Sequence, residues 1–197
     1  MYTDKDAYVD PSSSGASYHR RVFEDIGYYD ERFDACEDVE FNYRVHLSGR
    51  QSFTSLKLAV YYYPRENLRR LFHQMKRYGI GRMRLARKHP GSLSPGTLIP
   101  ALFTAGLIAL PLLSLASRWF AYAFLLFYGL YFLMIFLSSA TIAGRHGLHF
   151  LPKLLRIYPM IHLGLGWGFL SELVRTLLGQ GPDLSPAGDQ TRAPTTS

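Results

Sequence analysis

Cysteine is almost absent from this 197-residue sequence, which contains only Cys36. A single cysteine excludes a disulfide bond within the chain and fits a reducing compartment. An apolar leader is also missing, because the first residues, MYTDKDAYVDPSSSG, are polar and rich in Asp and Ser. We therefore expect the soluble part of the chain to stay in the cytoplasm, with Cys36 as a small packing residue.

Acidic residues are scarce in one part of the chain and frequent in another. Residues 1–50 hold eleven Asp or Glu and six Lys or Arg, whereas residues 65–90 hold nine Lys or Arg and one acid, Glu66. The formal net charge of +7 could indicate nucleic-acid binding. However, the basic cluster lies directly before a long apolar stretch, where Lys and Arg favour the cytoplasmic face and anionic lipid. We therefore interpret residues 65–94 as a basic amphipathic interface segment and expect membrane lipid, and no nucleic acid, as a partner.

Charges are absent from two long apolar windows, residues 97–116 and 119–143. About twenty apolar residues are enough to cross a bilayer as a helix, so both windows are predicted to span a membrane as a tight hairpin. Basic residues flank the hairpin on one side, which predicts a multi-pass inner-membrane protein with both flanks in the cytoplasm. A third window, residues 157–173, is shorter and could span, re-enter or lie in the interface. Residues 179–197 are rich in Pro, Gly, Ser and Thr and are predicted to be disordered.

The first ninety residues have the pattern of an incomplete α/β domain. A short helix is expected to end at Gly27, a second helix to cover residues 37–47, and a strand to lie within residues 51–63. So small an α/β unit buries little apolar surface unaided. The predicted fold is therefore an α/β fragment over residues 1–64, followed after the basic segment by two or three transmembrane or interfacial helices over residues 95–178.

Four short motifs follow one another in the first fifty residues. They are a small-residue loop, a basic pair that opens a helix, an aromatic-Asp-Glu turn, and a Glu-Asp pair that starts a helix ending near a glycine: Gly15-Ala16-Ser17, Arg20-Arg21, Tyr29-Asp30-Glu31 and Glu37-Asp38. Their order and spacing resemble the acceptor-side half of family 2 glycosyltransferases, which have a GT-A fold, over roughly residues 8–90. Within that family the arrangement is most similar to membrane enzymes of the succinoglycan-biosynthesis type, which extend lipid-linked or surface polysaccharides.

The aspartate of the Glu-Asp pair has the central role that the resemblance implies. In the family it is the general base that deprotonates the acceptor hydroxyl, which then attacks the anomeric carbon of a nucleotide-sugar with inversion. The matching residue here is Asp38. A carboxylate within hydrogen-bond reach can take a proton from a poorly nucleophilic sugar hydroxyl, and a helix N-terminus favours its ionised form. The alternative is that Glu37 and Asp38 only cap a helix.

Other residues of these motifs are expected to contact the substrates. The resemblance implies substrate-binding roles for Gly15 and Ala16 in the small-residue loop and for Glu37 beside the base. Glu40 could orient the acceptor, or it could form an ion pair with Arg44 at the i, i+4 spacing of a helix.

A second motif, Gln74-Met75-Lys76-Arg77-Tyr78, lies in the basic segment. It resembles the Gln-x-x-Arg-Trp element that processive family members carry on a membrane-interface helix. The resemblance implies that Tyr78 stacks on the acceptor sugar and that Gln74 and Arg77 approach the donor diphosphate. Tyr78 replaces the tryptophan of the family, which counts against processive synthesis. The alternative is an amphipathic interfacial helix with no part in catalysis.

Two features of the family are missing from the sequence. The family binds its donor in an N-terminal half, where an Asp-x-Asp element holds Mg²⁺ or Mn²⁺. Asp4-Lys5-Asp6 has the same letters but follows no apolar strand. We therefore expect a divalent cation whose ligands lie outside this chain. Either the gene product is truncated or split, or a partner supplies the missing half.

These patterns together predict one function and leave one alternative open. The predicted function is the C-terminal part of an inverting glycosyltransferase that moves a sugar from a nucleotide-sugar to a lipid-linked or polysaccharide acceptor at the cytoplasmic membrane face. The alternative is a noncatalytic, truncated membrane subunit that docks a partner or anionic lipid.

Overall fold

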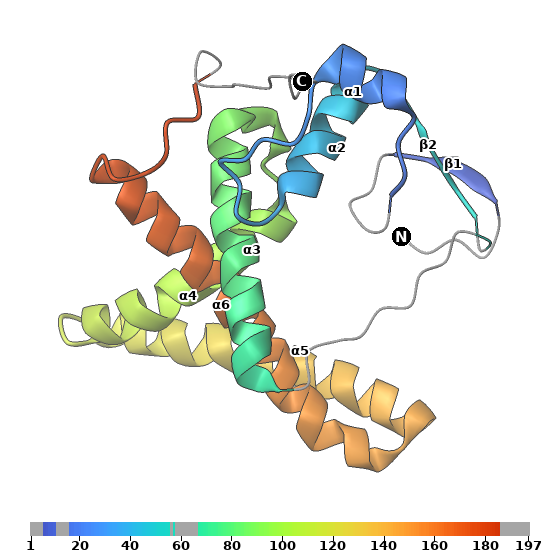
Figure 1. The fold of residues 1–197 in the computed structure, drawn as a ribbon. Helices are drawn as coiled ribbons and strands as arrows, with labels where there is room; N and C mark the ends of the chain where they lie inside the picture. The colour runs from blue at the N-terminus through green and yellow to red at the C-terminus, as the bar shows by residue number, and fades with distance from the viewer. Residues whose placement is uncertain (1–5, 11–15, 56, 58–66, 186–197) are drawn as a thin grey trace.

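The computed structural model describes residues 6–10, 16–55, 57 and 67–185. Most of these residues are helical, and Figure 1 shows how the helices are arranged. The elements in chain order are β1 (Ala7–Val9), α1 (Arg20–Ile26), α2 (Glu37–Leu47), β2 (Ser52–Thr54), α3 (Leu68–Lys88), η2 (Pro90–Ser92), α4 (Pro95–Ser114), α5 (Arg118–His146), η3 (Leu148–Phe150) and α6 (Leu151–Leu177).

The N-terminal part contains two helices and a two-stranded antiparallel sheet. α1 ends at Gly27, whose φ of 86° lies in the left-handed region that glycine reaches easily, and α2 has the predicted bounds. β1 pairs with β2, with Tyr8 opposite Phe53. Of the strand expected within residues 51–63, only β2 is formed in the described residues, and residues 58–63 lie outside them. In the described residues the strands are thus limited to this ribbon, one end of which lies beside α1 in Figure 1.

α3 is the central helix, and it contacts both the N-terminal part and the C-terminal helices. One apolar cluster joins α3 to the loop before α2 and to the end of the described chain: Phe33, Leu85 and Leu184, with Val39 and Tyr43 against it. A second cluster joins α3 to α4 and α6: Met83, Ala101 and Phe169, with Leu170 and Leu173 against it. α3 therefore holds the motif-bearing segments against the apolar helices.

Glycines bring α3 and α6 close together where they cross. A Cβ added at Gly164 would lie 2.6 Å from the Cβ of Met75, and one at Gly79 would lie 2.8 Å from the backbone nitrogen of Phe169. Gly164 and Gly168 have the four-residue spacing at which glycines let helices in bilayers pack closely. The third apolar window is thus part of a 27-residue helix packed on α3 and α4.

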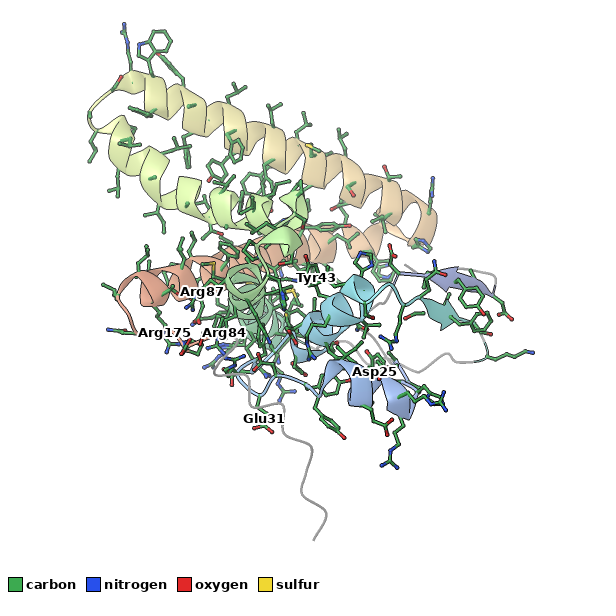
Figure 2. All side chains as sticks on the ribbon, turned by 90° about the horizontal axis from the view of Figure 1, so that it is seen from above. Asp25, Glu31, Tyr43, Arg84, Arg87 and Arg175 are labelled. Carbon is green, nitrogen blue, oxygen red and sulfur yellow. The ribbon has the colours of Figure 1, made fainter. Side chains whose placement is uncertain are left out.

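α4 and α5 are long and apolar enough to cross a membrane by length and composition, and no other helix in the described residues meets this measure. Only 22% of the apolar window of α4 and 11% of that of α5 is buried inside the protein, unlike the core helix of a soluble domain. A short turn joins them, with the Oγ of Ser117 accepting from the N–H of Trp119 at 3.4 Å. Figure 2 shows the two helices side by side along one side of the molecule.

The beginning of the predicted disordered tail is ordered. Leu184 is buried against Phe33, and the guanidinium of Arg32 donates to the carbonyl oxygens of Asp183 and Ser185 at 2.9 and 3.1 Å. A buried leucine explains why composition alone misjudged residues 179–185. The rest of the predicted tail, residues 186–197, lies outside the described residues.

Candidate functional site

A cavity of about 630 Å³ lies where the start of α2 meets α3, α4 and α6. We call it the interface cavity, because its walls come from both the motif-bearing helices and the apolar helices. Its lining residues are Cys36, Asp38, Val39, Met75, Tyr78, Gly79, Arg82, Ser94, Gly96, Thr97, Pro100, Leu165 and Phe169. Asp38 and Tyr78, which two separate motifs predicted as base and stacking residue, therefore share one cavity.

Asp38 is the second residue of α2, and its half-buried carboxylate lines the cavity. The backbone N–H of Val39 donates to its Oδ1 at 2.8 Å. Burial raises the pKa of Asp38 above its ordinary value, and the neighbouring Glu37 carboxylate acts in the same direction. The backbone hydrogen bond and the Arg82 charge act against this rise. A carboxylate with a raised pKa is a stronger proton acceptor, which suits a general base.

Cys36 sets the direction in which α2 begins. It has a φ of 66°, the left-handed conformation that non-glycine residues seldom adopt, and its thiol lies 3.6 Å from the carbonyl oxygen of Tyr78. Burial raises the pKa of this thiol to about 11, so the thiol stays protonated at neutral pH. Cys36 is therefore the buried packing residue that the sequence predicted, and it fixes the start of α2 against α3.

A hydrogen bond from another residue of α3 holds the side chain of Tyr78. The amide nitrogen of Gln74 donates to the hydroxyl oxygen of Tyr78 at 3.0 Å, which joins two residues one turn apart on α3. Gln74 itself does not line the interface cavity. In this structure the first residue of the motif therefore holds the Tyr78 side chain, and Tyr78 is the motif residue that lines the cavity together with Met75.

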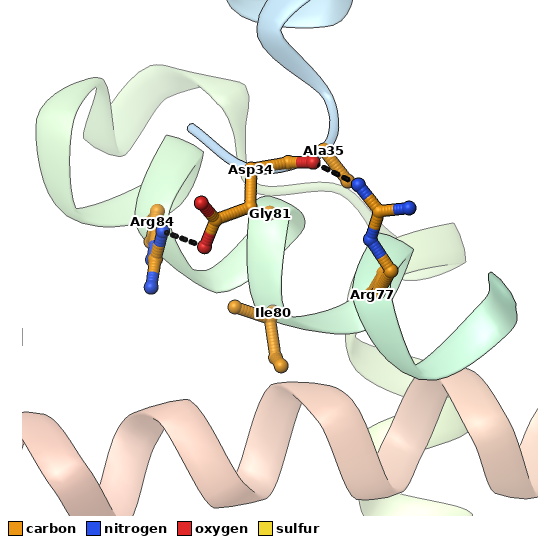
Figure 3. A pocket seen from close by; sticks show the side chains of 6 residues that line it. All are labelled: Asp34, Ala35, Arg77, Ile80, Gly81 and Arg84. Atoms are coloured by element: carbon orange, nitrogen blue, oxygen red, sulfur yellow. Dashed lines mark hydrogen bonds and ion pairs between the residues drawn. The ribbon is translucent and has the colours of Figure 1, made fainter. Parts of the chain in front are cut away.

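Arg77 lies beside a second, smaller cavity of about 260 Å³, shown in Figure 3. Its guanidinium donates to the backbone carbonyl of Asp34, while Arg84 binds the Asp34 carboxylate at 3.1 Å from the other side. These contacts attach α3 to the loop before α2. Arg77 thus lines the smaller cavity, whereas Tyr78, the next residue of the motif, lines the interface cavity.

Glu40 is placed in a buried ion cluster and not in the interface cavity. Its carboxylate is fully buried and contacts Arg44 at 3.0 Å, Lys88 at 3.0 Å and His89 at 2.9 Å. Burial alone would raise the pKa of Glu40, but the hydrogen bonds from Arg44 and His89 outweigh it and lower the pKa. The Arg44 ion pair that its spacing allowed is confirmed. The expected acceptor contact is not supported, because no part of this carboxylate is exposed.

Glu37 and Ala16, two further residues with predicted substrate-binding roles, do not line the interface cavity. Glu37 is exposed beside Asp38. Ala16 is exposed in the segment before α1, and Gly15 lies outside the described residues. Arg20 forms an exposed ion pair with Glu24 at 3.1 Å.

Two features of the site were missed in the sequence. Arg82 lines the interface cavity, although the sequence indicated only a flanking charge. Arg84 and Glu172 form a buried ion pair of 2.8 Å between α3 and α6. An isolated acid in an apolar segment was the available signal for this pair, because a buried carboxylate needs a partner.

No group of three or more His, Cys, Asp or Glu side chains in the described residues could hold a metal ion. The divalent cation that the family resemblance implies therefore does not fit the residues described. That its ligands lie elsewhere stays a prediction.

No family model and no solved structure matches the chain. The succinoglycan biosynthesis protein ExoA of Rhizobium meliloti (strain 1021) is 40% identical to it over 68 residues. The match covers 34% of the chain, and the chain spans about a fifth (21%) of the length of this relative. Over part of its length, the chain is thus similar to a protein of succinoglycan biosynthesis.

Proposed function

We propose that the chain is the acceptor-side part of an inverting, GT-A-type glycosyltransferase and that Asp38 is its general base. The observation that carries this proposal is the meeting of Asp38 and Tyr78 in the interface cavity. Each residue was predicted from a different motif, on a different helix. The partial similarity to a succinoglycan biosynthesis protein supports a role in polysaccharide synthesis.

The proposed reaction uses Asp38 as a proton acceptor. An acceptor hydroxyl in the cavity gives its proton to the Asp38 carboxylate while its oxygen attacks the anomeric carbon of the nucleotide-sugar. The bond from that carbon to the diphosphate breaks, and its electron pair leaves with the diphosphate. Tyr78 offers a ring face on which the acceptor sugar can stack. Because burial raises the pKa of Asp38, its carboxylate takes the proton more readily than an exposed aspartate does.

A membrane location fits the same geometry. Ser94, Gly96 and Thr97, at the start of α4, form part of the cavity wall, and α4 and α5 are long and apolar enough to span a bilayer. We propose that the cavity lies at the cytoplasmic face of the inner membrane, where nucleotide-sugars are available. The acceptor would then be lipid-linked or a polysaccharide at that face.

The test measures sugar transfer in membranes that contain the protein expressed from its natural gene context. Labelled UDP-sugars and GDP-sugars are supplied, and incorporation into lipid or polysaccharide is counted. Asp38→Asn should lower transfer by roughly 10²-fold or more, since a general base contributes about 10²–10⁴-fold. Asp25→Asn, which removes an exposed carboxylate that lies outside the four motifs and does not line the cavity, should retain wild-type transfer.

Transfer by Asp38→Asn at the wild-type rate would exclude Asp38 as the base. If membranes with the wild-type protein insert it normally but transfer no sugar from any donor, the noncatalytic subunit becomes the better description.

A further inference from the structure

The interface cavity is lined by an exposed cation, Arg82. Three other arginines of α3 hold neighbouring segments: Arg77 donates to Asp34, Arg84 to Glu172, and Arg87 to the carbonyl of Pro182. Arg82 lines the cavity and has no hydrogen bond or ion pair with any described residue. Arg82 acts on Asp38 through its charge, and its guanidinium donors are available for an anionic ligand in the cavity.

The walls of the cavity are polar at one part and apolar at another. Ser94 and Thr97 place two hydroxyl groups 3.1 Å apart at the start of α4. Pro100, Leu165 and Phe169 supply apolar surface from α4 and α6. A ligand that matches both parts has an anionic head and a hydrocarbon chain.

The position of the cavity indicates where such a ligand comes from. α4 begins at the cavity wall and is one of the two helices long and apolar enough to cross a membrane. A hydrocarbon chain lying along Pro100 and Phe169 therefore follows the surface of a candidate membrane helix. A free phosphate would leave this apolar wall uncovered.

We propose that Arg82 binds the phosphate group of a lipid phosphate and thereby places the head of that lipid beside Asp38. This inference rests on the proposed function and narrows its acceptor to a phosphate-bearing lipid. Arg82 is a positioning residue in this proposal, since the proton goes to Asp38. Arginine suits the role because its planar guanidinium can donate two parallel hydrogen bonds to a phosphate.

Binding to the purified full chain tests this directly, without any sugar donor. The chain is placed in nanodiscs of neutral phosphatidylcholine, and octyl phosphate, octyl glucoside and inorganic phosphate are titrated by calorimetry. We expect octyl phosphate to bind more tightly than the other two. Arg82→Gln should weaken octyl phosphate binding about tenfold or more, the effect of losing a charge-assisted hydrogen bond. Arg82→Lys should weaken it less, because the charge remains.

Arg69→Gln is the matched control, because Arg69 is an exposed arginine on the same helix that does not line the cavity. Equal binding of octyl phosphate by wild type and Arg82→Gln would overturn the proposal. So would equal weakening by Arg69→Gln, which would indicate general surface charge, or inorganic phosphate binding as tight as octyl phosphate. Asp38→Asn should bind octyl phosphate at least as tightly as wild type. The binding experiment uses no sugar donor, so its result can be interpreted even if the chain transfers no sugar.

Discussion

The surroundings of Asp38 disfavour the ionised form of its carboxylate. Burial in the cavity wall and the adjacent Glu37 both raise its pKa, and the Val39 N–H and Arg82 only partly offset them. A raised pKa means that the ionised form is less stable in the folded chain than in the unfolded chain. The same feature that makes Asp38 a good proton acceptor therefore lowers the stability of the fold.

Asp38→Asn should make the protein more stable near neutral pH. The folded-state pKa of Asp38 lies above the ordinary value of 3.8, so its unfavourable contribution is fully present above the folded pKa. This contribution disappears as the pH falls below 3.8, where the wild-type carboxyl is protonated in both states. Unfolding of wild type and variant in detergent, followed by circular dichroism at several pH values, measures the difference.

Asp30→Asn is the control variant, and its effect on stability should have the opposite sign. Burial alone would raise the pKa of Asp30, but hydrogen bonds from Arg32 and Lys88 hold it well below its usual range. The stability that Asp30 contributes is therefore present above pH 3.8 and is lost as the pH falls towards its folded pKa. Asp30→Asn should thus destabilise the protein at neutral pH. Destabilisation by both variants would contradict the account given for Asp38.

Individual residues were predictable where a local motif defined them. Asp38 and Tyr78 could be selected because their neighbours in the sequence form recognisable patterns. Of the partners of Glu40, only Arg44 was visible, since it lies one helical turn away, whereas Lys88 and His89 come from the far end of α3. Such distant partners depend on how α2 packs against α3, which local spacing does not determine.

At the level of the helices, the crossing of α3 and α6 supports the site. Gly79 on α3 and Gly168 on α6 let the two backbones approach, and α3 carries Tyr78 and Arg82 while α6 carries Phe169 of the cavity wall. The C-terminal ends of α1 and α2 were predictable from the glycines that follow them. The crossing was not, because glycine in an apolar window also fits a re-entrant or interfacial segment.

Gly168→Ala should destabilise the protein by about 1–3 kcal/mol, the usual effect of overpacking. The new Cβ would collide with the backbone of Lys76 and lie 3.0 Å from the nitrogen of Ile80, and backbone atoms cannot move aside as a side chain can. Gly144→Ala is the control, since a Cβ at Gly144 in α5 meets nothing within 4 Å. Thermal unfolding in mild detergent compares the two. An equal effect of both substitutions would mean that the close approach of α3 and α6 is not important for stability.

The ion pair between Arg84 and Glu172 also joins α3 to α6. Glu172 is fully buried, and its Oε1 accepts from the Nε of Arg84 at 2.8 Å. Glu172→Leu should cost up to about 3–5 kcal/mol, because it removes the buried partner of the Arg84 guanidinium and leaves only the exposed Asp34 carboxylate to balance its charge. The double variant Arg84→Met and Glu172→Leu should recover part of this loss. Recovery stays incomplete because Arg84 also donates to the carbonyl of Arg32 at 2.7 Å. Additive single-variant effects in unfolding would show that the two residues do not interact.

In the molecule as a whole, the buried ion clusters and the exposed apolar surface lie on different elements. Buried ion clusters tie the N-terminal part to α3, whereas α4 and α5 expose large apolar side chains along much of their length. The apolar windows predicted this division from composition alone. The sequence did not predict that the interface cavity would form at the boundary, because its walls come from four segments that only the tertiary fold brings together.

The proposed membrane orientation makes a prediction about the two turns that flank α5. If α4 and α5 cross the inner membrane from a cytoplasmic cavity, Ser117 lies outside the cytoplasm and His149 lies inside it. Cys36 is buried, so Cys36→Ala provides a background without thiols. In intact cells, a membrane-impermeant maleimide should label Ser117→Cys, while His149→Cys should react only after permeabilisation. Labelling of both positions in intact cells, or of neither position before permeabilisation, would contradict a hairpin that spans the membrane. Labelling of His149→Cys alone would place the cavity on the outer face, where cytoplasmic nucleotide-sugars are absent, and would therefore count against the proposed sugar transfer as well.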